Sequence, residues 1–132
     1  MVLMQKTIRE LAPLLRSKAV SPVELTQECL QRIEQTEPAI NAFITVTADA
    51  ALQAAATVEA EILRGRYRGP LHGIPYSAKD LYMTRGIATT AGSPVLAGNV
   101  TATNAAVIDA MENAGAVLVG KNELKKIHYC TN

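Results

Sequence analysis

The chain has 132 residues, of which 48% are apolar and 19% are charged, and this balance predicts one folded domain rather than a disordered segment. Thirteen Lys and Arg residues against twelve Asp and Glu residues leave a net charge of +1. That near-balance excludes the strongly basic surface typical of proteins that bind nucleic acid or anionic membranes.

The first half of the chain predicts helices. Thr7 and Glu10 fit a capping box, in which each side chain satisfies a free backbone amide at the start of a helix. Pro13 is expected to bend or shorten this first helix. A second helix is predicted to begin after Ser21, again with a capping Glu, and we expect Pro38 to end it.

Two further elements complete this half. Residues 42–46 are aromatic and β-branched, which indicates a short strand or an extended connector. An alanine-rich stretch over residues 51–62 predicts a core helix, and Gly65 is a suitable stop for it. The arginines that follow, over residues 64–68, are interpreted as a solvated loop.

The second half changes character, because Gly and Pro interrupt it repeatedly. The predicted elements are an extended segment at 76–80, a loop at 88–98, a helix at 104–114 and a short buried strand at 116–119. Strand, helix and strand in this order indicate a parallel α/β unit. We therefore predict an α/β fold with a helical leader at 1–66 and a partial α/β core at 67–132, together forming one compact unit.

Cysteine and histidine usage argues against a disulfide framework or a metal site. Cys29 lies on an apolar helical stripe, where cysteine behaves as a small hydrophobic residue, and Cys130 is far away in sequence. His72 and His128 stand alone, without metal-ligand spacing. No signal-peptide stretch or transmembrane-length apolar run occurs. We expect a cytoplasmic protein with no cofactor, no metal and no membrane partner.

One motif resembles a phosphate loop, but the resemblance fails. Residues 115–122 nearly match the pattern, yet Asn122 replaces the hydroxyl residue that would bind magnesium. In addition, the residues between Gly115 and Gly120 are themselves predicted to be a strand, whereas a phosphate loop must follow one. Nucleotide binding is not expected here.

A second set of motifs is more specific. The segment 69–80 reads Gly-Pro-Leu-His-Gly-Ile-Pro-Tyr-Ser-Ala-Lys-Asp, and it is followed by Thr-Thr-Ala-Gly-Ser at 89–93 and by Gly115 to Lys121. With the leader motifs at 21–25 and 41–43, these residues resemble the amidase-signature family in order and spacing. The resemblance covers roughly residues 7–121.

The resemblance implies an α/β fold around a mixed sheet and a serine–cis-serine–lysine triad, with Lys79 as the triad lysine. A lysine acts as a base only when neutral, so burial and neighbouring groups must favour the neutral amine in such a site. The competing interpretation of Lys79 is an exposed side chain paired with Asp80. A mechanism that uses His72 with Ser77 or Ser93 is disfavoured, because the resemblance assigns His72 to a structural turn.

The family pattern is incomplete in this sequence. The Gly- and Ser-rich segment that supplies both triad serines is absent, and lysines stand at 125 and 126 where the family has small or acidic residues. We therefore expect an amidase-like fragment that is inactive alone, its small amide substrate being known only from full-length relatives. The alternatives are an enzyme with another nucleophile and an assembly module.

Two weaker expectations follow from the missing part. Strands at 74–78 and 116–119 would expose edges or faces that the rest of the fold normally covers, which predicts a homo-oligomer. Lys79 without its serines could also bind a small carboxylate or amide weakly.

Overall fold

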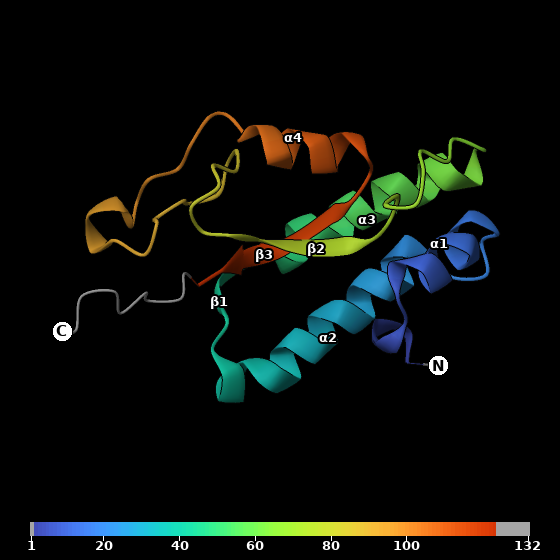
Figure 1. Ribbon diagram of the computed structural model, residues 1–132, viewed down its shortest axis with the longest axis horizontal. Helices are drawn as coiled ribbons and strands as arrows, with labels where there is room; N and C mark the ends of the chain where they lie inside the picture. The colour runs from blue at the N-terminus through green and yellow to red at the C-terminus, as the bar shows by residue number, and fades with distance from the viewer. Residues whose placement is uncertain (1, 124–132) are drawn as a thin grey trace.

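The computed structural model describes residues 2–123, which form helices packed around a three-stranded sheet (Figure 1). The α-helices are α1 (Ile8–Arg16), α2 (Pro22–Ile40), α3 (Ala48–Leu63) and α4 (Ala106–Asn113). The strands are β1 (Phe43–Val46), β2 (Pro75–Lys79) and β3 (Val117–Asn122), and short 3-10 helices lie at η1 (Leu3–Gln5) and η2 (Pro94–Leu96). The fold is mixed α/β, as predicted.

The sheet has the order β1-β3-β2, with β2 parallel and β1 antiparallel to β3. The β2–α4–β3 segment is therefore the predicted parallel α/β unit. The expectation that residues 116–119 expose an edge is wrong, because β1 from the first half of the chain pairs with β3 and places it in the centre. Val117 and Val119 are consequently buried.

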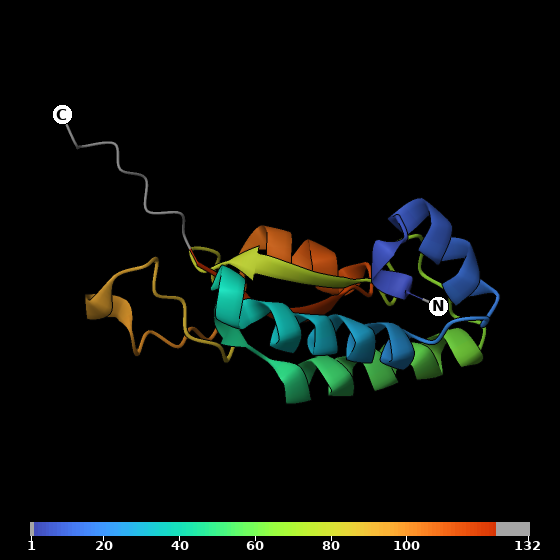
Figure 2. The same ribbon diagram turned by 90° about the horizontal axis from the view of Figure 1, so that it is seen from below.

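Helices cover both faces of the sheet. In Figure 2, α2 and α3 lie side by side below the strands, and α4 lies on the opposite side. Cys29 and Ile33 of α2 pack with the buried alanines of α3 and with the valines of β3 in one core cluster. The predicted apolar stripe that contains Cys29 is thus confirmed, while Cys130 and His128 lie outside the described residues. The close packing of α2 on α3 depends on Ala51 and Ala55, which are fully buried.

The predicted starts of α1 and α2 are confirmed, but the predicted end of α2 is wrong. Thr7 with Glu10, and Ser21 with Glu24, form complete capping boxes. Pro38 does not end α2, which continues to Ile40. The Glu37 carboxylate accepts hydrogen bonds from the backbone amides of Ala42 and Phe43, at 2.6 and 3.1 Å, and so stabilises the last turn despite the proline. Within residues 2–123, no helix combines the length and apolar character needed to cross a membrane.

Candidate active site

Lys79 is the last residue of β2 and its side chain is exposed. It borders a hollow of about 400 Å³ between the end of β2 and α4. The other side chains of this hollow are both polar and apolar, and they include Ser77, Tyr82, Val107, Met111 and Asn122. An amine at the rim of a partly apolar hollow can meet a small polar molecule bound there.

The backbone on both sides of Lys79 is fixed by hydrogen bonds. Residues 75–79 pair with β3, and the Asp80 amide continues the ladder by donating to the Asn122 carbonyl at 3.0 Å. The Tyr82 amide then donates to the Lys79 carbonyl at 3.1 Å, which closes a tight turn directly after the strand. The Lys79 side chain therefore starts from a well-defined point.

Asp80 does not pair with Lys79, so that interpretation of the sequence is wrong. The Asp80 carboxylate is fully buried and lies 3.6 Å from the Lys121 ammonium group, which is also fully buried. Its other oxygen accepts hydrogen bonds from the Thr90 amide, at 3.1 Å, and from the Thr90 hydroxyl. Burial lowers the pKa of Lys121, and the nearby Asp80 carboxylate opposes that shift.

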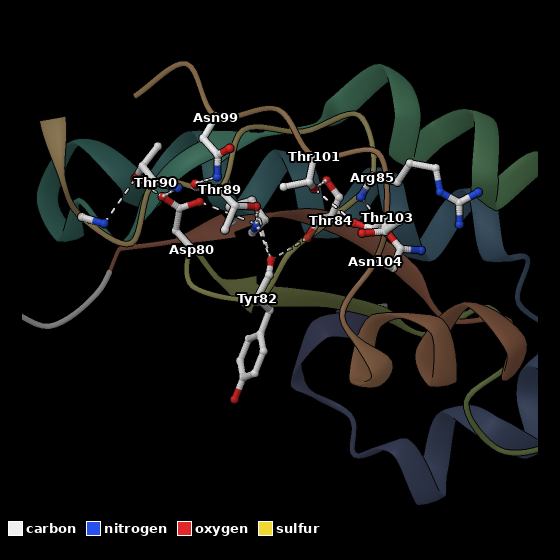
Figure 3. A network of polar contacts seen from close by, with 12 residues as sticks. Asp80, Tyr82, Thr84, Arg85, Thr89, Thr90, Asn99, Thr101, Thr103 and Asn104 are labelled. Carbon is white, nitrogen blue, oxygen red and sulfur yellow. Dashed lines mark hydrogen bonds and ion pairs between the residues drawn. The ribbon is translucent and has the colours of Figure 1, made fainter. Parts of the chain in front are cut away.

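Lys121 also binds the turn that follows Lys79. Its ammonium group donates to the Tyr82 carbonyl at 2.8 Å and to the Thr89 hydroxyl at 3.0 Å. The Tyr82 carbonyl additionally accepts from the hydroxyls of Thr84 and Thr89, at 3.0 and 3.4 Å. Figure 3 shows the Tyr82 ring pointing away from this polar network while its carbonyl takes part in it.

His72 has a structural environment. It is fully buried, its Nδ1 accepts from the Arg68 amide at 3.0 Å, and its Nε2 lies 3.1 Å from a Glu61 carboxylate oxygen. These contacts define the neutral tautomer in which Nε2 carries the hydrogen, and this N–H donates a hydrogen bond to the Glu61 carboxylate. Both ring nitrogens are thus occupied without a serine, which leaves no room for Ser77 or Ser93 to be activated by this histidine.

The arginines lie in an exposed loop, as predicted. Arg64, Arg66 and Arg68 are all exposed. Arg68, however, binds the Glu61 carboxylate at 2.7 Å and donates to the carbonyls of Glu112 and Asn113 at the end of α4.

Among the described residues, no three His, Cys, Asp or Glu side chains converge on a point that could hold a metal ion.

The sequence matches the Amidase family over residues 24–132. The chain belongs to the amidase family. It is 52% identical over 102 residues to a glutamyl-tRNA(Gln) amidotransferase subunit from Chloroflexus aurantiacus, a match that covers 77% of this chain and 21% of that protein. It is 46% identical over 118 residues to the corresponding mitochondrial subunit from Ornithorhynchus anatinus, covering 89% of this chain and 22% of that protein.

Solved amidase structures share this fold. The native peptide amidase of Stenotrophomonas maltophilia matches with a TM-score of 0.84 and 36% identity, over 90% of this chain and 25% of that enzyme. The amidase chain described here therefore spans about a fifth to a quarter of the length of these relatives, and it contains a part of the amidase-signature fold.

The sequence motif singles out Lys79 as a candidate but gives no indication of the network around Asp80. Lys121 ends both the last of the resembling motifs and the rejected phosphate-loop match, and neither pattern indicates that it lies in the buried interior of the sheet. A lysine at an alternating buried position of an apolar strand, after Val117 and Val119, is the signal that could have revealed it.

Proposed function

We propose that this chain is the amino-terminal part of an amide hydrolase and that Lys79 is the lysine of its serine–cis-serine–lysine triad. The observation that carries the proposal is the position of Lys79. It ends a motif-bearing strand, its side chain is free at the rim of a hollow, and hydrogen bonds fix the backbone on both sides of it.

In this mechanism the neutral lysine accepts a proton from the bridging serine, which accepts one from the nucleophilic serine as that oxygen attacks the amide carbonyl. The carbon–nitrogen bond then breaks, the amine leaves with a proton, and water hydrolyses the acyl-enzyme. The Gly- and Ser-rich segment that supplies both serines does not occur in the 132 residues. The chain alone therefore lacks the nucleophile, and we propose that it is inactive by itself.

The proposed substrate class is a linear amide. The relatives include an amidotransferase subunit and a peptide amidase, and both names refer to reactions of amides. We place the protein in the cytoplasm and assign no cofactor to the reaction.

The test is a chimera in which residues 2–123 of this chain replace the matching segment of the Chloroflexus aurantiacus relative. We expect the chimera to release ammonia from a panel of linear amides, the Lys79→Met variant to lose this activity, and the matched Lys6→Met variant to keep it. Activity that survives in Lys79→Met would contradict the assignment of the lysine. Turnover by the isolated chain that disappears in Lys79→Met would contradict its inactivity.

A second proposal is that the chain also assembles with copies of itself. Within residues 2–123, strand β2 has a hydrogen-bonded neighbour on one side only, namely β3. Beside it, Tyr82 and Val107 border the same hollow and remain 40% and 48% exposed. A free strand edge next to exposed apolar side chains favours association with another chain.

A further inference from the structure

The largest fully buried side chain of the described residues is a lysine, and it contacts the turn that follows Lys79. We infer that Lys121 is a positioning residue for Lys79: its buried ammonium group fixes the turn at the end of β2 and thereby the point from which the Lys79 side chain extends. The inference rests on the proposed function for its catalytic meaning, but its structural part stands on contacts of the chain itself.

Two short paths connect the lysines. In the first, the Lys121 ammonium group donates to the Tyr82 carbonyl, and the amide of the same residue donates to the Lys79 carbonyl. In the second, Lys121 lies 3.6 Å from the Asp80 carboxylate, and Asp80 is the residue directly after Lys79. Each path contains a single residue between the two lysines, Tyr82 in the first and Asp80 in the second. Loss of the Lys121 ammonium group should therefore change the backbone position of Lys79 directly.

The chemistry of the ammonium group explains why a lysine is suited to this position. An ammonium group has three donor hydrogens and no acceptor; Lys121 donates two hydrogen bonds, to Tyr82 and Thr89, and forms an ion pair with Asp80 at 3.6 Å. Because a buried ion pair often stabilises a fold no more than apolar side chains of similar volume, we attribute to Lys121 the selection of one arrangement of the turn. Without the ammonium group, the Tyr82 carbonyl and one Asp80 oxygen would lose their buried cationic partner.

Lys121 is not itself a candidate for the triad lysine. It is 0% exposed, and its donors are engaged with the protein. The hollow beside β2 is bordered by Lys79 and not by Lys121. The two lysines therefore have different roles: Lys79 borders the hollow, and Lys121 fixes the turn after β2.

The experiment compares Lys121→Met and Thr89→Val with the control Val20→Ala. Lys121→Met removes the ammonium group, and Thr89→Val removes the hydroxyl that accepts from Lys121 and donates to the Tyr82 carbonyl. Val20 is buried in a second core cluster, which also contains Leu25 and Ile74, the residue directly before β2. Its truncation therefore weakens the fold without touching the turn at the far end of that strand. Thr89→Val is the milder change and decides the question if Lys121→Met does not fold.

In the isolated chain, hydrogen exchange of the Tyr82 amide is measured, because this amide makes the hydrogen bond to Lys79. We expect exchange to accelerate at least about tenfold in Lys121→Met and Thr89→Val, as for the loss of a buried charge-assisted hydrogen bond, and to change little in Val20→Ala. Equal exchange rates in the wild-type chain and both turn variants would overturn the inference.

In the chimera, we expect Lys121→Met to lower kcat about 100-fold with KM nearly unchanged, as for a small misplacement of a catalytic group. A loss of kcat in Val20→Ala as large as in Lys121→Met would overturn the positioning role. A wild-type chimera without turnover would count against the proposed function alone, because the exchange of the Tyr82 amide still decides whether Lys121 fixes the turn.

Discussion

At the scale of single residues, Gly115 is required by a neighbouring side chain as well as by its backbone. Gly115 follows α4 with φ +81°, and a Cβ added there would overlap the ring of His72, lying 3.0 Å from its Cγ and Nε2. Gly65 follows α3 with nearly the same φ, +85°, but has no neighbouring atom within 4 Å of an added Cβ. A substitution at Gly65 therefore measures backbone strain alone, whereas the same substitution at Gly115 measures backbone strain together with steric overlap.

We predict that Gly65→Ala destabilises the chain by about 1–2 kcal/mol, the cost of a left-handed conformation for alanine. Gly115→Ala is expected to cost roughly 2–5 kcal/mol, because the overlap with buried His72 adds an overpacking penalty. Urea unfolding of both variants measures the difference. Equal losses would show that His72 moves aside freely.

His72 itself gives the fold a pH dependence. Burial lowers its pKa from the ordinary 6.5, against the opposing effect of the Glu61 carboxylate. The hydrogen bond from the Arg68 amide to Nδ1 favours the same neutral form, because a protonated Nδ1 could not accept it. Below pH 6.5 the unfolded chain takes up a proton at this residue before the folded chain does.

The contribution of neutral His72 is therefore complete above pH 6.5 and declines as the pH falls from 6.5 toward the lower pKa of the folded state. We predict that the free energy of unfolding decreases between pH 7.5 and pH 5.5, with a slope of at most about 1.4 kcal/mol per pH unit from this one proton. Urea midpoints across this range test it, and His72→Gln should flatten the decline. Greater stability of the wild-type chain at pH 5.5 than at pH 7.5 would contradict the assignment.

At the scale of elements, local chemistry predicted where α1 and α2 begin but not where α2 ends. The capping boxes at Thr7 and Ser21 involve residues three apart, so the sequence contains the whole interaction. The end of α2 depends instead on the Glu37 carboxylate binding the Ala42 and Phe43 amides, which the pattern of helix breakers does not reveal. Pro38 was for that reason mistaken for a stop.

We predict that Pro38→Ala stabilises the chain by about 1 kcal/mol, because alanine restores a helical amide at an interior position of α2 and removes the clash of the ring with the preceding turn. The matched variant is Pro22→Ala, at the first position of the same helix, where an amide has no partner within the helix. Truncation of the buried Pro22 ring should instead lower stability. Thermal unfolding compares the two variants, and a loss of stability in Pro38→Ala would refute the argument.

At the scale of the whole molecule, the elements were predictable but their pairing was not. The short runs of β-branched residues indicated β1 and β3, yet their contact joins Phe43 to Asn122 across most of the chain. The contacts of Lys121 with Tyr82 and Asp80 likewise join residues that only the sheet brings together. Because β1 pairs with β3 and the α2–α3 core includes Val117, we propose that residues 1–66 and 67–132 fold as one unit.

In the part of the chain that the structure describes, one edge of β2 has no paired strand, and we propose that this edge and the apolar rim of the neighbouring hollow form the surface for association. We predict a dimer or larger homo-oligomer at micromolar concentration, measured by size-exclusion chromatography with light scattering, because unpaired strand groups and exposed Tyr82 and Val107 gain partners on assembly. Val107→Lys should shift the population toward monomer by placing a charge in the contact. The matched Leu63→Lys variant, at an exposed apolar residue at the end of α3, should leave it unchanged. A clean monomer for the wild-type chain would refute the proposed assembly while leaving the assignment of Lys79 intact.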